Sequence, residues 1–481
     1  MKTLANFIDG QRKPPASGIY LDDVEPATGN LLARIPDSTA VDVNEAVAAA
    51  ARAFPEWSGL PIAARAECLQ RLAGLIQANA LELARLESTD TGKPLQLALD
   101  VDMARAQANL QFFAGAMTHW TSTCHDMGPV GFNYTRREAL GVVALITPWN
   151  LPLYLLTWKL APALVTGNTV VAKPSELTPL TADALCELAR EAGIPPGVFN
   201  LVHGSGNSCG QALVDHPDIR AISFTGGTTT GRRIATSVAP RLIKTSLELG
   251  GKNPALVFDD ADLESTLPGL VRAGFTNQGQ VCLCSSRLLV HESIHDQLVS
   301  RLADLVAALR VGDPTAGDTD QGALISRAHQ RKVLSFIEHA RDQGGQILCG
   351  GQAVQPPGRC NQGYFVAPTV ITGLPADCRL HREEIFGPVV TVQGFADEDE
   401  AIALANAVDY GLSATVWTGQ LRRAHRVAAR LQTGIVWINN WLVRDLRTPF
   451  GGMKDSGLGR EGGEWSLAFF TETKNVFVDG N

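Results

Sequence analysis

The chain has 481 residues, of which 45% are hydrophobic and 19% are charged, and its acidic excess gives a net charge of −8. This length and composition are those of a globular protein of two or three domains. The acidic balance argues against binding to nucleic acids or anionic membranes, which attract basic surfaces. Nine cysteines without regular spacing argue against a disulfide framework and favour a reducing compartment.

No segment of the sequence predicts a membrane span or a secretory signal. The most apolar region, residues 140–167, is interrupted by Pro148, Lys159 and Pro162, whereas a span needs about 20 uninterrupted apolar residues. The first ten residues contain no apolar stretch long enough for a secretory signal. We therefore expect a soluble, cytoplasmic protein with no nucleic-acid, membrane or metal partner.

The first half of the chain predicts helices, then an arm, then a parallel sheet. Residues 40–117 have the Ala- and Leu-rich periodicity of helices, and the short, polar, irregular stretch 118–137 is typical of an extended arm. From residue 140, β-branched runs alternate with helical segments. The predicted strands are 142–147, 169–173, 198–202 and 219–224, and the predicted helices are 155–165 and 181–192. This alternation indicates a doubly wound parallel sheet.

The second half predicts another α/β region, from about residue 248 to 437. Its strand candidates are 255–258, 287–290, 389–394 and 414–417. The last residues alternate as a terminal strand near 470–480. The fold class is therefore α/β, with two lobes, an arm and a C-terminal strand.

Two segments at strand ends are candidates for binding a nucleotide, although the chain lacks a Gly-x-Gly-x-x-Gly motif. The turn Thr225-Gly226-Gly227 follows a strand and opens a helix, where backbone N–H groups can approach a phosphate. Such small residues are also common simple turn formers. Lys173 and Glu176 follow the neighbouring strand, where their side chains could bind the hydroxyls of a ribose. Alternatively, they form a solvated pair on the surface.

Three further residues are candidates for chemistry. Cys282 follows a glycine-containing turn and is either a nucleophile or a small buried residue, and Cys284 leaves the choice between the two thiols open. Glu248, beside Leu249, is either a general base or a surface carboxylate. Asn150, in a proline-containing loop, either donates to an oxyanion or caps a turn.

Taken together, these segments resemble the aldehyde dehydrogenase superfamily over essentially the whole chain. Eight matching segments occur in the family's order, and the spacing from Glu248 to Cys282 is the family's. They are residues 147–150, 173–176, 223–226, 247–254, 277–282, 363–370, 383–389 and 449–454. The Gly-Gln-x-Cys motif of the family selects Cys282 over Cys284 as the nucleophile.

The resemblance implies a mechanism and a cofactor, NAD. Cys282 would attack the aldehyde, Asn150 with the Cys282 backbone N–H would hold the alkoxide, and Glu248 would activate the water that hydrolyses the thioester. The residues implied at the cofactor are Trp149, Lys173, Glu176, Gly226, Gly227, Glu384 and Phe386. The carboxylate of Glu176 would repel a 2′-phosphate and so favour NAD over NADP. Gly227 departs from the family, which usually has serine there.

The substrate is inferred from a narrower resemblance, to the muconic semialdehyde dehydrogenase branch, which is carried by residues 154–159, 282–285 and 441–444. The expected reaction is oxidation of 2-aminomuconate 6-semialdehyde to 2-aminomuconate. Arg105 and Arg444 would bind the remote carboxylate, because a guanidinium offers planar bidentate donors. Alternatively, Arg105 and Arg444 form salt bridges on the surface or between the lobes. Arg447 is a nearby residue that could bind the carboxylate instead. Other candidate substrates are 2-hydroxymuconic semialdehyde, betaine aldehyde and aliphatic aldehydes, and a noncatalytic crystallin-like protein is the alternative of another class.

The resemblance also implies a domain organisation. A Rossmann-like NAD-binding domain would comprise residues 1–117 and 138–247, and a catalytic domain residues 248–440. The arm, 118–137, and the C-terminal segment, 465–481, would form an oligomerisation element that pairs with another subunit. A homodimer or homotetramer is therefore expected.

Overall fold

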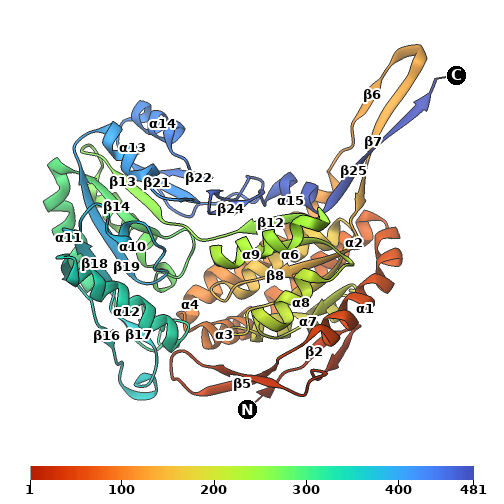
Figure 1. Ribbon diagram of the computed structural model, residues 1–481, viewed down its shortest axis with the longest axis horizontal. Coiled ribbons are helices and arrows are strands. Elements are labelled where there is room, and N and C mark those ends of the chain that lie inside the picture. Colours follow the sequence, from red (N-terminus) through yellow and green to blue (C-terminus); the bar gives the residue numbers. More distant parts are fainter. Residues whose placement is uncertain (1, 481) are drawn as a thin grey trace.

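The computed structural model describes residues 2–480, so Met1 and Asn481, the outer ends of two predicted ranges, lie outside the described residues. The chain forms two α/β lobes, and an arm projects from the first (Figure 1). The first lobe contains an eight-stranded sheet in the order β24-β12-β11-β8-β9-β10-β2-β3. Its strands are β2 (Asn6–Ile8), β3 (Gln11–Lys13), β8 (Val142–Ile146), β9 (Thr169–Lys173), β10 (Phe199–Leu201), β11 (Ile219–Thr225), β12 (Lys244–Glu248) and β24 (Gly457–Leu458). Neighbours from β12 to β10 are parallel, which confirms the predicted sheet.

Helices cover both faces of this sheet because its buried strands alternate their side chains between the faces. Val143 and Leu145 join a core with α2, α5, α6 and α7, whereas Ala144 and Ile146 join a core with α1, α8 and α9. The helices are α1 (Ala40–Gly59), α2 (Ile62–Ala78), α3 (Ala80–Thr91), α4 (Leu95–Leu97), α5 (Ala104–Thr118), α6 (Pro152–Val165), α7 (Leu180–Glu191), α8 (Gln211–Asp215) and α9 (Thr228–Val238), with a π-helical segment at Ala98–Met103. The predicted helix 155–165 begins earlier, at Pro152, because proline is well suited to a first helical turn.

The second lobe has a seven-stranded sheet in the order β15-β18-β19-β14-β13-β21-β22. Its strands are β13 (Asn253–Val257), β14 (Ser285–His291), β15 (Gln346–Cys349), β18 (Thr369–Thr372), β19 (Val389–Phe395), β21 (Ser413–Trp417) and β22 (Ile435–Ile438). Its helices are α10 (Leu263–Phe275), α11 (His295–Ala307), α12 (Arg327–Asp342), α13 (Glu398–Asn406) and α14 (Leu421–Arg430). All four strands predicted here are confirmed.

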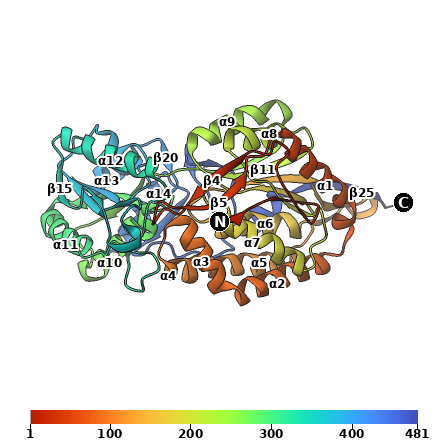
Figure 2. The ribbon, with the colours of Figure 1, turned by 90° about the horizontal axis from the view of Figure 1, so that it is seen from below.

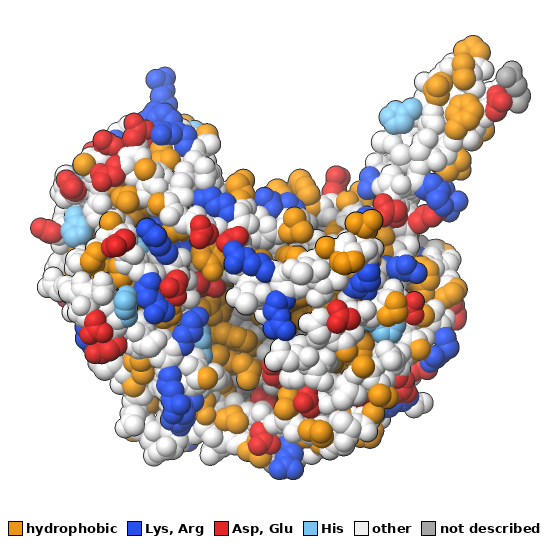
Figure 3. All heavy atoms as spheres, in the orientation of Figure 1, with side chains coloured by type: hydrophobic (Ala, Val, Ile, Leu, Met, Phe, Trp, Pro, Cys, Tyr) orange, Lys and Arg blue, Asp and Glu red, His pale blue; other side chains and the backbone are white. Residues whose placement is uncertain are grey.

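The predicted arm and terminal strand pair with each other. Strand β25 (Thr471–Asp479), which follows α15 (Gly463–Phe469), pairs antiparallel with β7 (Gly131–Ala139) along its whole length, and β7 also pairs with β6 (Cys124–Asp126). Hydrophobic side chains gather at the outer end of the arm (Figure 3). The exposed ones in these segments are Met127, Val130, Phe132, Phe477 and Val478.

Three small sheets complete the fold. One is formed by β1 (Lys2–Thr3), β5 (Leu31–Pro36) and β4 (Tyr20–Val24), and β4 and β5 face the viewer when the molecule is seen from below (Figure 2). The others pair β16 (Ala353–Val354) with β17 (Phe365–Val366), and β20 (Tyr410–Gly411) with β23 (Met453–Lys454). Within residues 2–480, no helix is long and apolar enough to cross a membrane. All nine cysteines are free thiols.

The fold brings the chemically interesting segments of the first lobe to one edge. Lys173 ends β9, Thr225 ends β11 and Glu248 ends β12, while Asn150 follows β8. These four strands are adjacent and parallel, so their carboxyl ends meet at the same edge of the sheet. That edge is where open α/β sheets bind ligands.

Candidate active site

Three cavities adjoin at this edge, and Cys282 lines two of them. The outer cavity, of about 360 Å³, is lined by Lys173 and Glu176 and shares Trp149 and Gly226 with a middle cavity of about 260 Å³. The middle cavity reaches Cys282, which also lines a narrower inner cavity. The thiol therefore lies between the wider middle cavity and the narrower inner cavity.

The loop that carries Cys282 is fixed by an unusual backbone and by two amide side chains. Asn277, Gln278 and Gly279 have positive φ, of 53°, 55° and 68°, which non-glycine residues rarely adopt and which clusters at functional sites. Asn253 Nδ2 donates to the Cys282 carbonyl at 2.7 Å. Asn150 Nδ2 donates to the Gln280 carbonyl at 2.9 Å. Asn150 thus lies against the nucleophile loop, and its second amide hydrogen remains available.

The two candidate thiols differ in their surroundings. Cys282 is partly exposed, whereas Cys284 is buried and its Sγ lies 3.8 Å from the Thr276 carbonyl oxygen. Cys284 lines none of the three cavities. Burial, followed by the charges of Glu384 and Glu248, raises the pKa of the Cys282 thiol well above its usual range. The resting thiol is therefore protonated at neutral pH.

Glu248 is a buried carboxyl group, which contradicts the surface alternative. It is 3% exposed, lines the inner cavity with Cys282, and neither of its oxygens has a hydrogen-bond partner among the described residues. Gly451 leaves room for it, since a Cβ there would come within 2.7 Å of Glu248 Oε1. Burial, and then the nearby Glu461 carboxylate, raises the pKa of Glu248 well above its ordinary value.

A buried ion pair beside Glu248 was not predicted from the sequence. Lys159 Nζ donates to Glu461 Oε1 at 2.6 Å, and Trp158 Nε1 donates to Glu461 Oε2 at 2.7 Å. Ser223 Oγ bridges the pair, accepting from Lys159 at 2.9 Å and donating to Glu461 at 3.1 Å. Lys159 and Glu461 are 302 residues apart, so no local motif signals their contact.

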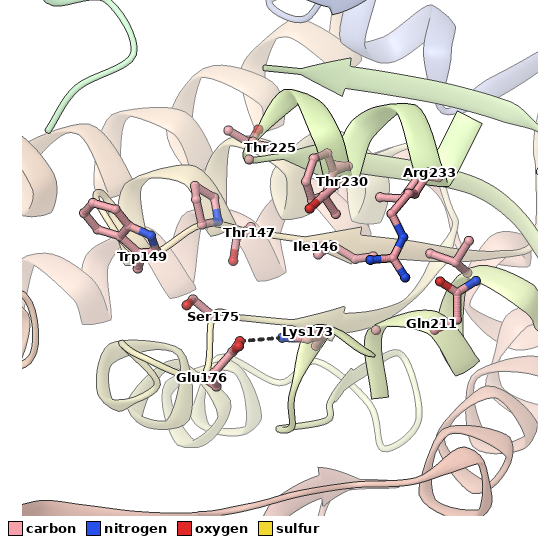
Figure 4. Close-up of a pocket in the computed structure, with 18 of the residues that line it drawn as sticks. Ile146, Thr147, Trp149, Lys173, Ser175, Glu176, Gln211, Thr225, Thr230 and Arg233 are labelled. Carbon is pink, nitrogen blue, oxygen red and sulfur yellow. Dashed lines mark hydrogen bonds and ion pairs between the residues drawn. The ribbon is translucent and has the colours of Figure 1, made fainter. Parts of the chain in front are cut away.

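The outer cavity suits the adenosine and phosphate parts of a dinucleotide. Lys173 Nζ lies 3.4 Å from Glu176 Oε2 at the end of β9 (Figure 4). Gly226 and Gly227 immediately precede α9, where backbone N–H groups are unpaired and favour an anion. Gly227 has no side chain to cap this helix, so the backbone alone offers the donors. Arg233, from α9, reaches towards Gln211 at the other end of the cavity (Figure 4).

The middle cavity is bounded by a carboxyl group and by aromatic rings. Glu384 Oε1 accepts from the Gly251 backbone N–H at 2.9 Å. Gly250 permits this approach, because a Cβ there would lie 2.3 Å from Glu384 Oε2. Trp149 and Phe386 pack edge to face with centroids 5.2 Å apart.

His329 and Lys332 also line the middle cavity and were missed by the sequence analysis. The His329 ring lies 5.4 Å from the Trp149 ring, and its Nε2 contacts the Phe386 carbonyl at 2.6 Å. Burial lowers the pKa of His329 to about 4, so the ring is neutral and can donate to that carbonyl. Both residues lie on α12, where polar side chains are common on the exposed face, so the sequence did not mark them as functional.

The inner cavity is mostly apolar, and Arg444 lies on its wall. Its guanidinium carbon lies 3.9 Å from the centre of the Phe450 ring and 5.1 Å from that of Trp158. Arg105 does not line this cavity. Arg447 has an 80% exposed side chain paired with Asp445, so Arg444 is the arginine that faces the thiol's inner side.

No cluster of three or more potential metal ligands of the His, Cys, Asp and Glu type occurs in the part of the chain that the structure describes.

Known proteins resemble the chain over almost its full length. Residues 14–476 match the model of the aldehyde dehydrogenase family. A 2-aminomuconic semialdehyde dehydrogenase from Bos taurus is 50% identical over 99% of this chain and 98% of its own length. A 2-hydroxymuconic semialdehyde dehydrogenase from Pseudomonas sp. (strain CF600) is 45% identical over 99% of this chain and 100% of its own length. The NAD⁺ complex of an aldehyde dehydrogenase from Bacillus cereus has a TM-score of 0.96 at 39% identity, covering 99% of this chain and 96% of that one.

Proposed function

The chain belongs to the aldehyde dehydrogenase family, and we propose that it oxidises a semialdehyde bearing a remote carboxylate, with NAD as the hydride acceptor. The proposed reaction converts 2-aminomuconate 6-semialdehyde to 2-aminomuconate. The observation that carries this proposal is the placement of Arg444 on the wall of the same small cavity as Cys282 and Glu248. A cationic group there, in mostly apolar surroundings, suits a substrate whose far end is anionic.

Three side chains divide the proposed chemistry. Cys282 first loses its thiol proton to solvent, and the resulting thiolate attacks the aldehyde carbon and forms a thiohemiacetal. Asn150, already held against the nucleophile loop, donates its free amide hydrogen to the alkoxide together with the Cys282 backbone N–H. Loss of hydride leaves a thioester on Cys282. Glu248, in its ionised form, then removes a proton from the water that hydrolyses the thioester. Its raised pKa makes that carboxylate a stronger base, and its oxygens have no competing hydrogen-bond partner among the described residues.

The outer and middle cavities fit NAD. When bound, NAD supplies the acceptor for the hydride that leaves the substrate carbon. Glu176 and Lys173 would hold the adenine ribose, and Glu384 would hold the nicotinamide ribose, because carboxylates accept from ribose hydroxyls. Gly226 and Gly227 would bind the pyrophosphate through their backbone, and Trp149 and Phe386 would line the nicotinamide site. The charge of Glu176 disfavours a 2′-phosphate, so we propose NAD over NADP.

A second substrate candidate is 2-hydroxymuconic semialdehyde. It carries the same remote carboxylate, and the relative from Pseudomonas named for it is 45% identical to this chain. Betaine aldehyde is disfavoured, because its quaternary ammonium would meet the Arg444 cation. Cys282 shares the middle cavity with Asn150 and the inner cavity with Glu248, and this arrangement argues against a noncatalytic crystallin-like role.

A substrate panel tests this function. We expect kcat/KM with NAD to be highest for 2-aminomuconic or 2-hydroxymuconic semialdehyde, and lower for a neutral unsaturated aldehyde of the same length and for betaine aldehyde. If kcat/KM were highest for the neutral aldehyde, the proposed substrate class would be wrong. If no aldehyde gave NADH, the proposed NAD-dependent activity would be wrong.

We also propose the domain roles that follow. Residues 1–117 and 138–247 would bind NAD, and residues 248–440 would carry the nucleophile. The arm, 118–137, and residues 465–481 would join a second copy of the chain in a cytoplasmic dimer or tetramer. The exposed apolar end of the arm supports this proposal, because such patches commonly mark interfaces.

A further inference from the structure

Tyr154 links the two arginines that the sequence placed at the substrate. It lies on α6, is 7% exposed and lines the inner cavity with Cys282 and Arg444. Arg444 Nη1 donates to Tyr154 Oη at 2.8 Å. Arg105, from α5, places its guanidinium carbon 5.8 Å from the centre of the Tyr154 ring. Arg105 therefore meets the tyrosine ring without lining the cavity.

The geometry leaves the hydroxyl hydrogen of Tyr154 without a partner. A guanidinium only donates hydrogen bonds, so the contact with Arg444 uses a lone pair of the phenol oxygen and leaves its O–H free. Within residues 2–480, no group accepts a hydrogen bond from Tyr154 Oη. Buried polar groups are nearly always paired, so a donor in this position calls for an acceptor from a ligand.

The cavity wall around this donor favours an anionic acceptor. Arg444 makes cation–π contacts with Phe450 and Trp158, which help to hold its guanidinium at the cavity wall. A carboxylate bound by Arg444 would have a second oxygen beside Tyr154 Oη, because the two donors are 2.8 Å apart. Hydrogen bonds to a charged group are stronger than neutral ones, and strongest in apolar surroundings.

We propose that the Tyr154 hydroxyl donates directly to the remote carboxylate of the substrate, so that Tyr154 and Arg444 form the carboxylate site. Arg105 lies beside this pair, with its guanidinium over the Tyr154 ring. This inference rests on the proposed function, since it requires a substrate with a remote carboxylate. It adds a tyrosine hydroxyl to the arginines expected at this carboxylate.

The variant Tyr154→Phe tests the direct contact, because it keeps the ring and removes only the hydroxyl. We expect kcat/KM for 2-hydroxymuconic semialdehyde to fall about 10- to 100-fold, and that for a neutral unsaturated aldehyde of equal length to change less than about 3-fold. Tyr364→Phe is the matched control: Tyr364 is also buried, lies under the guanidinium of Arg327 and lines none of the three cavities. It should alter neither rate. Equal losses on both aldehydes, or no loss, would overturn the proposal.

The same substitution in an Arg444→Met variant shows whether Tyr154 contacts the substrate directly or only holds Arg444 in place. In Arg444→Met, the added change Tyr154→Phe should still lower kcat/KM for the charged substrate about 3-fold or more, whereas a supporting role predicts no further loss.

The wild-type enzyme distinguishes failure of this inference from failure of the proposed function. A wild type that prefers the charged aldehyde, with a Tyr154→Phe variant that keeps this preference, would overturn the role of Tyr154 alone. A wild type without the preference would overturn both. Thermal unfolding of each variant shows whether a lost rate reflects an unfolded protein.

Discussion

Lys159 Nζ and Glu461 Oε1 are 2.6 Å apart, and the two side chains are almost completely buried. Both charges act on Glu248: the Glu461 carboxylate raises the pKa of Glu248, and the Lys159 ammonium lowers it. The pair therefore modulates the pKa of Glu248, which burial raises most. Neither residue lies near Glu248 in the sequence, so this control is a property of the folded chain.

The first prediction concerns the pH dependence of thioester hydrolysis. A protonated Glu248 cannot accept a proton from water, so hydrolysis should rise as the pH passes upward through its raised pKa. Glu461→Gln removes a negative neighbour, so the rise should move to lower pH. The pH profile of kcat with an aldehyde limited by deacylation measures this. A profile moved to higher pH would contradict the assignment.

The second prediction separates the two thiols. Cys282→Ala should reduce kcat by at least about 10³-fold, since no other thiol lines the inner cavity with Glu248. Cys284→Ser should retain most activity, because Cys284 is buried away from all three cavities. NADH formation for each variant, with NAD binding followed by fluorescence titration, checks both. Reversed results would show that the nucleophile is Cys284.

The third prediction concerns cofactor selection. Glu176→Gln keeps the size of the side chain and removes the charge that would face a 2′-phosphate, while Lys173 remains in place. The ratio of kcat/KM for NAD to that for NADP should fall by about 10-fold, the equivalent of roughly 1.4 kcal/mol. Glu187→Gln, on the surface of α7, is the control. A wild type that prefers NADP would contradict this role.

The fourth prediction compares three arginines. Arg444→Ala should lower kcat/KM for a carboxylate-bearing semialdehyde about 10- to 100-fold, the loss of a charge-assisted hydrogen bond worth about 1.5–3 kcal/mol. Arg105→Ala should cost less, because Arg105 lies outside the inner cavity. Arg447→Ala should cost nothing, since its side chain is exposed and paired with Asp445. If Arg447→Ala lowered kcat/KM more than Arg444→Ala, Arg447 would be the arginine that binds the carboxylate.

Much of the fold could be predicted because helices and strands leave periodic patterns of apolar residues within short stretches of sequence. The strand Thr169–Lys173 was predicted with its observed bounds, since a β-branched run between turns has few other conformations. The strand 198–202 was predicted longer than its observed range, Phe199–Leu201, because strand ends depend on neighbours that periodicity does not reveal.

The site could be predicted only where a motif carries it. Cys282, Glu248 and Asn150 lie in recognisable segments, and they converge because β8 and β12 end at one edge with the Cys282 loop against it. Tyr154 and His329 belong to ordinary helices, and their roles depend on partners far along the chain, such as Arg444 at 290 residues' distance. Such contacts arise from packing, which a local pattern does not encode.

The fifth prediction tests the central claim, that Cys282 carries the acyl group of a carboxylate-bearing substrate. Glu248→Gln should block hydrolysis while leaving acylation intact, so NAD with 2-hydroxymuconic semialdehyde should yield about one equivalent of NADH and a stable thioester. Mass spectrometry of the quenched protein should find the acyl mass on the peptide containing Cys282. An unmodified Cys282 with undiminished steady-state turnover would contradict the account.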